Sequence, residues 1–141
     1  MWDPSYETRL ADWYNFRKYI SQLDLSEQLI QTNNWWFQAP MVNSAVQWNQ
    51  WPDWPDPWTL LTHSGYCELA RALGIVYTLM LIDEPKYTDL SIAQIGQDNL
   101  VLVDQGKYIL NWAPREVLNI NSIEDPIRRS ISSKDLQRFL T

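Results

Sequence analysis

Near the start of the chain, apolar side chains recur at the spacing of one helical face. They are Tyr6, Leu10, Trp13, Tyr14 and Ile20. This pattern predicts a helix over about residues 4–21, with Asp3 as its cap and Pro4 in its first position. Asp24 is followed three residues later by Glu27, the spacing of a capping box, which predicts a second helix that ends near Asn33.

In the middle of the chain, segments typical of helices and strands follow one another. Pro57 comes directly after Asp56, a capping residue, and predicts the start of a helix. Residues 66–73 are mostly strong helix formers, and Gly74 stands where a left-handed glycine often ends a helix. Residues 75–82 are apolar and rich in β-branched and aromatic side chains, so they predict a short buried strand.

The second half of the chain has the pattern of an antiparallel meander. Strands are expected over residues 90–95, 100–103 and 108–112, and Gly106 can take the positive φ of the turn between the last two. Residues 117–123 predict one more strand or an irregular wrap, and Ser133 is expected to cap a short C-terminal helix. Helices first and strands later indicate an α+β fold, in which N-terminal helices pack on a small antiparallel sheet of three to four strands.

A chain of 141 residues is expected to form one domain, over residues 1–141. Its parts, in order, are a helical hairpin (1–34), a segment rich in tryptophan and proline (35–58), a helix with a strand meander (59–112), and a C-terminal wrap with a short helix (113–141).

Tryptophan is concentrated in the second of these parts. Trp48, Trp51 and Trp54 recur every third residue among prolines, which predicts an extended polyproline II segment with an aromatic ridge along one edge. With Asp53 and Asp56 beside it, the ridge is interpreted as a partner-binding surface. Stacking on sugars, stacking on single-stranded bases and burial in the domain's own core are the alternatives. Trp35, Trp36 and Trp58 adjoin the predicted helices and are the stronger candidates for the core.

Charge narrows the list of partners. A net charge of −6 and a pI near 4.6 disfavour binding to nucleic acid. The C-terminal part is less acidic, because residues 112–141 carry 5 basic and 4 acidic side chains. Arg128, Arg129, Lys134 and Arg138 could bind an acidic neighbour, although such residues are more often plain surface charge.

Composition also sets aside several kinds of site. One cysteine and one histidine allow neither a disulfide framework nor a Cys/His zinc site within one chain, and no metal site or cofactor is predicted. No apolar run is long enough to cross a bilayer, and the start of the sequence lacks the features of a secretory signal. A soluble, intracellular protein without a small-molecule ligand is expected.

Cys67 is the one candidate nucleophile of its kind. It follows a glycine near the start of a predicted helix, where the helix dipole lowers a thiol pKa, and His63 would be its base from four residues back. The favoured interpretation is instead that Cys67 is a small buried apolar residue, as free cysteines often are.

The order of a cysteine helix, a glycine and then strands resembles the core of transglutaminase-like and papain-like proteins. In that resemblance, the strands of NLVLVDQGKYILNWAP put Asn99 in the place of the catalytic histidine and Asn111 in the place of the aspartate. Both differences remove the catalytic group, which implies at best an inactive relative.

A broader resemblance covers most of the chain. The motifs WWFQAP, WPDPWTLL, YCELARALGIVYTL and NLVLVDQGKYILNW are similar to those of uncharacterised proteins of contractile-tailed phages of cyanobacteria and other marine bacteria. The resemblance implies a phage origin and a role in the virion or its assembly. It supplies no site residue.

These observations lead to one functional prediction and two alternatives. The prediction is a non-enzymatic phage protein of the neck, tail or baseplate, or an assembly factor, which contacts other phage structural proteins or a second copy of itself. It would be found in the host cytoplasm during infection or in the virion. The alternatives are a cysteine-dependent hydrolase or transferase of a degenerate papain-like type, and a glycan-binding module.

Overall fold

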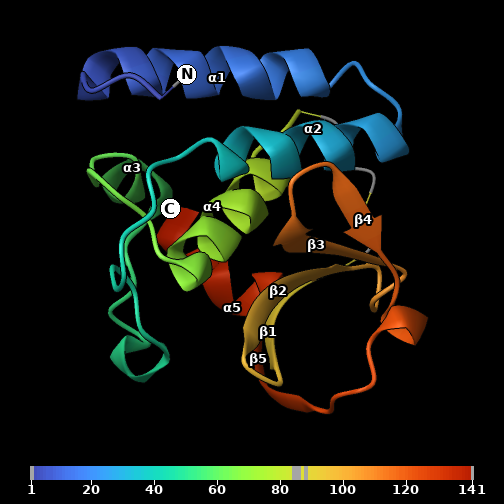
Figure 1. Ribbon diagram of the computed structural model, residues 1–141. Coiled ribbons are helices and arrows are strands. Elements are labelled where there is room, and N and C mark those ends of the chain that lie inside the picture. The colour runs from blue at the N-terminus through green and yellow to red at the C-terminus, as the bar shows by residue number, and fades with distance from the viewer. Residues whose placement is uncertain (1, 84–86, 88, 141) are drawn as a thin grey trace.

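The computed structural model describes residues 2–83, 87 and 89–140, and it has the predicted α+β architecture (Figure 1). Two N-terminal helices, α1 (Tyr6–Ile20) and α2 (Leu25–Phe37), lie above a central helix, α4 (Glu68–Met80), and α4 lies on an antiparallel sheet. The sheet has five strands in the order β4-β3-β2-β1-β5, one or two more than expected. They are β1 (Leu90–Ile95), β2 (Asp98–Val103), β3 (Tyr108–Ala113), β4 (Glu116–Leu118) and β5 (Ile127–Ser132).

Helix α4 forms the centre of the molecule, and here the strand predicted over residues 75–82 is wrong. The helix begins after Cys67 and runs through Gly74 to Met80. Almost all of its residues are buried, because α2 covers one side of it and the sheet covers the other. A helix that is buried all round has no polar stripe, and its short apolar run resembles a buried strand.

Gly74 allows the close approach of α2 to α4 and does not end the helix. A Cβ atom built on Gly74 would lie 2.5 Å from the ring of Trp36, which is fully buried. The need to place that ring also explains why α2 continues past Asn33 to Phe37. Asn33 itself is buried, and its side chain hydrogen-bonds to the backbone of Ala113 and Asn111.

One hydroxyl group joins three helices. Thr78 Oγ1 on α4 accepts a hydrogen bond from Trp13 Nε1 on α1 and another from Trp36 Nε1 on α2, both at 2.9 Å. It donates to the carbonyl oxygen of Gly74 at 2.7 Å. All three side chains are fully buried, so this cluster fixes how both N-terminal helices sit on α4.

The predicted meander is confirmed in its main hairpin. Residues 104–106 have positive φ values of 52°, 61° and 88°, and the last of these is Gly106, as expected for the turn between β2 and β3. Residues 117–123 are divided between the end of β4 and a 3₁₀ turn, Ile120–Ser122. They cover the face of the sheet that is turned away from α4, where Leu118 and Ile123 pack on a second apolar cluster.

Strand β5 and several helix ends differ from the predictions. β5 was not expected, because four of its six residues are exposed and it lacks a clear alternating pattern. The C-terminal helix α5 (Ser133–Leu136) is capped by Ser132, one residue before the predicted cap, and Ser5 rather than Asp3 caps α1. The short helix α3 (Pro57–Leu60) is capped by Asp56 as predicted.

Candidate functional site

The tryptophan-rich segment is not an extended ridge. Trp48–Gln50 forms a 3₁₀ turn, and the chain then bends back, so that Trp54 Nε1 donates a hydrogen bond of 2.6 Å to the carbonyl oxygen of Gln47. Trp54 is buried, with 2% of its surface exposed, and its ring lies 5.4 Å from that of Trp48 and 5.5 Å from that of Trp51. We call residues 48–54 the tryptophan turn. The polyproline II prediction fails because burial of Trp54 requires the chain to fold over it.

The C-terminal segment covers the tryptophan turn. Phe139 lies edge-on to Trp51 at 5.7 Å, and the guanidinium of Arg138 lies 5.3 Å from the centre of the same ring. The guanidinium of Arg129, on β5, lies 5.1 Å from the centre of the Trp48 ring. Sequence reasoning treated these arginines as surface charge and missed their contacts, because nothing in the local pattern relates residues this far apart in the chain.

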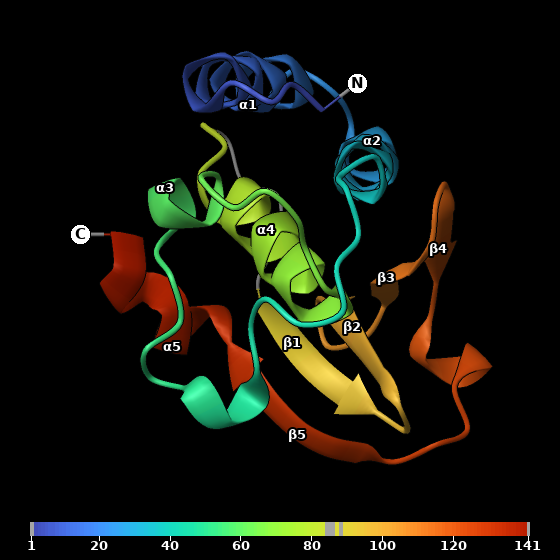
Figure 2. The same ribbon diagram turned by 60° about the vertical axis from the view of Figure 1, so that its left-hand side comes forward.

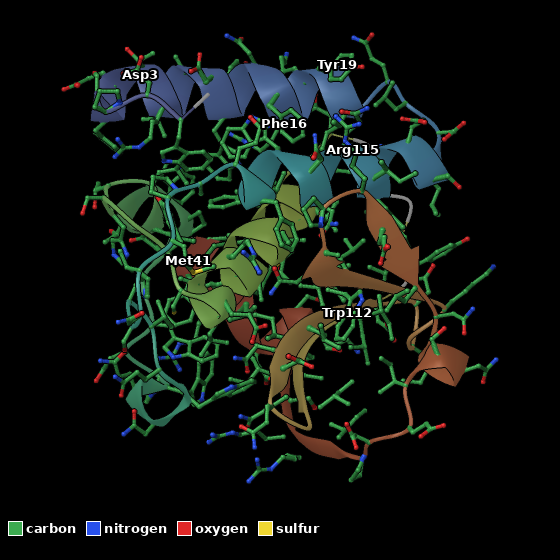
Figure 3. The ribbon with its side chains drawn as sticks, in the orientation of Figure 1. Asp3, Phe16, Tyr19, Met41, Trp112 and Arg115 are labelled. Carbon is green, nitrogen blue, oxygen red and sulfur yellow. The ribbon has the colours of Figure 1, made fainter. Side chains whose placement is uncertain are left out.

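The other residues predicted to lie on the binding surface or in the core agree only in part with the prediction. Asp53 is exposed, whereas Asp56 has a structural role, since its carboxylate accepts a hydrogen bond from the backbone N–H of Thr59. Trp36 is in the core as predicted, but Trp58 is 39% exposed. Two further aromatic side chains, Tyr19 on α1 and Trp112 on β3, are about half exposed, at 53% and 48% (Figure 3).

Cys67 occupies the N-cap position of α4 and is 8% exposed. Its thiol donates a hydrogen bond to the carbonyl oxygen of Val46 and accepts one from the N–H of the same residue, at 3.4 Å and 3.5 Å. His63 lies instead against the ring of Tyr66, at 6.1 Å, and burial lowers the pKa of its imidazole. Within the described part of the chain, Cys67 and His63 do not form a hydrogen bond. Residues 63–67 are not helical, so a spacing of four residues does not bring the two side chains onto one face.

The two asparagines that the papain-like resemblance singles out lie beside the start of α4. Asn99 on β2 donates hydrogen bonds from its backbone N–H and its side chain to Glu68 Oε1, at 2.8 Å and 3.1 Å. Asn111 on β3 donates from Nδ2 to the carbonyl oxygens of Asn99 and Glu68, at 2.7 Å and 3.0 Å. Both asparagines thus contact Glu68, the first residue of α4, and Asn99 also lines a groove together with Cys67.

This polar network continues at both ends. Asn99 Oδ1 accepts a hydrogen bond of 2.7 Å from Trp48 Nε1, and Asn111 Oδ1 accepts one of 2.6 Å from Arg71 Nε. Asn111 has a φ of +74°, which turns its side chain towards this network and away from the regular strand pattern. The side-chain oxygen and nitrogen of each asparagine are therefore hydrogen-bonded already.

A shallow groove of about 360 Å³ opens over the same place, and Trp48, Cys67, Glu68 and Asn99 contribute to its lining. Burial raises the pKa of the Glu68 carboxyl, and nearby Asp98 raises it further, whereas the two hydrogen bonds from Asn99 and the charge of Arg71 oppose the shift. The groove brings together a thiol, a carboxyl group and amide groups. The amide side chains of the groove, Asn43, Gln47 and Asn99, do not take up a proton at neutral pH.

Among the residues that the structure describes, no three His, Cys, Asp or Glu side chains are grouped as metal ligands would be. Within the same part of the chain, no helix combines the length and the apolar character needed to span a membrane. Comparison of the chain with family models, with curated proteins and with solved structures gives no match. Its function must therefore be argued from its own residues.

Proposed function

We propose that this chain is a non-enzymatic protein of a contractile-tailed phage, which acts through contacts with other proteins as a virion component or an assembly factor. The phage origin rests on the sequence motifs described above. The absence of a catalytic role rests on one structural observation. In the papain-like resemblance the base and its orienting partner correspond to Asn99 and Asn111, and the side chains of these two residues hydrogen-bond to Glu68, Trp48 and Arg71.

Cysteine catalysis needs a thiolate and a proton acceptor within hydrogen-bonding reach of it. Cys67 hydrogen-bonds to the backbone of Val46, and the strand residue that lines the groove with it, Asn99, has an amide side chain. The carboxylate of Glu68 is directed to Asn99. The same residues that could have formed a reactive site therefore hold α4, β2 and β3 together, and this favours an inherited scaffold over an enzyme.

The tryptophan turn supports protein contacts better than glycan binding. A sugar stacks on an open aromatic face, but Trp48 already contacts Trp54 and Arg129, and Trp51 contacts Trp54, Phe139 and Arg138. What remains accessible is a mixed surface of partly exposed rings, exposed arginine side chains and Asp53. Aromatic and arginine side chains of this kind are enriched where proteins bind each other.

Reactivity of the single thiol tests the non-enzymatic part of the proposal. We expect Cys67 to react with iodoacetamide slowly in the native protein and rapidly in urea, with the native rate following global unfolding, because the side chain is 8% exposed. Rapid alkylation of the folded protein at neutral pH would instead indicate an activated thiol and would refute this part of the proposal.

Recovery of the protein from infected cells tests the rest. A tagged copy produced during infection should cosediment with purified particles or with assembly intermediates, and Cys67→Ser should leave this unchanged. Asp53→Lys, at an exposed position of the tryptophan turn, should weaken the association, whereas Glu124→Lys, an equally exposed carboxylate in a pocket with Leu100 and Ile123, serves as the matched control. A protein that remains monomeric in the extract, or one whose association requires the thiol, would contradict the proposal.

A further inference from the structure

Strand β5 forms the longer free edge of the sheet. It pairs with β1 on one side, and within the described residues no strand pairs with its other side (Figure 2). The opposite edge, β4, is three residues long, whereas β5 has six. Residues 127–130 of β5 are all exposed. An edge of this kind offers backbone N–H and C=O groups to an added strand.

The exposed edge carries positive charge on an otherwise acidic molecule. Arg128 and Arg129 lie on β5, and Lys134 follows on α5, all exposed, while the whole chain has a net charge of −6. Among the described residues neither arginine forms an ion pair; Arg128 donates to the carbonyl oxygen of Gly96 and Arg129 donates from Nε to Gln94 Oε1. Each guanidinium therefore keeps N–H groups for a further acceptor.

The Arg129 side chain is also held in place. Its guanidinium rests over the ring of Trp48 at 5.1 Å while its Nε bonds to Gln94 at 2.7 Å. A guanidinium fixed in this way loses little side-chain entropy when it binds a carboxylate, for which its planar pair of N–H groups is well suited.

We infer that the free edge of β5 binds an extended acidic segment of another protein, by strand addition with carboxylates on Arg128 and Arg129. A second copy of β5 is a poor occupant, because pairing two such strands would bring four arginines onto neighbouring positions, and like charges across strands are destabilising. Nucleic acid is disfavoured as well, since the Trp48 ring already contacts Trp54 and the guanidinium of Arg129, and the chain as a whole is acidic.

This inference rests on the proposed function in that it names the chemistry of a protein partner and the surface that receives it. It also gives a role to the tryptophan turn that differs from the predicted one. The ring of Trp48 packs against the guanidinium of Arg129 and holds it in place, and Arg129 itself contacts the partner.

Two-dimensional NMR of the full chain provides the test. The probe is an acidic strand peptide of about eight residues, within the usual length of a strand, in which pairs of glutamates alternate with pairs of valines, so that carboxylates are present on both faces of the added strand. We expect shifts of the backbone N–H signals of residues 127–132. Arg128→Glu/Arg129→Glu should weaken binding at least about tenfold, the loss expected for one charge-assisted pair. Arg128→Glu alone, which spares the contact with Trp48, should also weaken it, and Lys18→Glu on α1, at the opposite end of the molecule, should not.

Three comparisons make the test decisive. A peptide with N-methyl groups on alternate residues should fail to bind, because it cannot complete the ladder of main-chain hydrogen bonds; equal binding would overturn strand addition. A peptide with lysine in place of each glutamate should also fail to bind, because its charge has the same sign as that of Arg128 and Arg129. Tighter binding of oligothymidylate than of the acidic peptide would assign the arginines to nucleic acid and refute the inference.

If no probe shifts residues 127–132, the arginines only protect the edge from aggregation and the inference is wrong. That outcome, with an unreactive Cys67 and association with particles, would leave the proposed function standing. Binding of the peptide by a protein whose Cys67 reacts rapidly would instead support the inference and refute the non-enzymatic part of the proposed function.

Discussion

Replacement of Thr78 by valine should destabilise the protein far more than the loss of one hydroxyl group suggests. Valine has nearly the shape of threonine, but it removes the oxygen that accepts hydrogen bonds from both Trp13 and Trp36, each at 2.9 Å. Both tryptophans are fully buried, so neither indole N–H can turn to water instead.

The magnitude follows from the two donors left without a partner. An unpaired buried donor costs about 1–3 kcal/mol, which gives a loss of about 2–6 kcal/mol for the pair. The lost hydrogen bond from Thr78 to Gly74 is offset by the easier burial of a methyl group, so we expect a net loss of about 3 kcal/mol. This is a large part of a typical domain stability of about 5–15 kcal/mol.

Thr78→Ser is the matched control, because it keeps the oxygen and removes one methyl group, at a cost of about 1 kcal/mol. Urea unfolding followed by near-ultraviolet circular dichroism measures both variants, and an unchanged slope confirms that the same surface is exposed on unfolding. A valine variant as stable as the serine variant would show that the two indoles do not depend on Thr78, and would refute the reasoning.

Two further predictions concern α4. Gly74→Ala should lower the free energy of unfolding by up to about 2 kcal/mol, because crowding Trp36 costs about 1–3 kcal/mol and helix propensity returns about 1 kcal/mol; stabilisation by about 1 kcal/mol in urea unfolding would contradict the tight contact. Burial raises the pKa of Glu68 above its usual 4.5, so its carboxyl favours the native state most at low pH and this benefit is lost as the pH rises through the raised pKa. Glu68→Gln keeps the acceptor oxygen and should therefore stabilise the protein at pH 7, with a difference that vanishes at pH 4; a difference independent of pH would refute this assignment.

The features that the sequence predicted correctly depend on neighbouring residues. Asp56 caps α3 and Gly106 completes a turn because the local backbone alone requires such residues there. The α+β order of elements follows equally from local patterns. The start of α2 was predicted because its cap, Asp24, is a local signal. Its end was not predicted, because it depends on the contact of Trp36 with Gly74, which belongs to another helix.

The features that could not be predicted are tertiary. Nothing near residue 75 distinguishes a fully buried helix from a buried strand, and the exposed residues of β5 acquire their structure by pairing with β1. Spacing placed Trp54 on a ridge, whereas the fold places it under Trp48 and Trp51. In the candidate site, the sequence singled out Asn99 and Asn111, but it gave no sign of their hydrogen bonds to Glu68 and Arg71.

The strand order β4-β3-β2-β1-β5 has a consequence for how the protein folds. β1 to β4 are joined by short turns, so their contacts are close in sequence and can form early, whereas β5 must return from residue 127 to meet β1 at residues 91–95. Closing this longer loop costs more chain entropy. We therefore expect the meander to assemble first and β5 to join last. Because the arginine over Trp48 arrives with β5, the tryptophan turn receives its cover in the final step of folding.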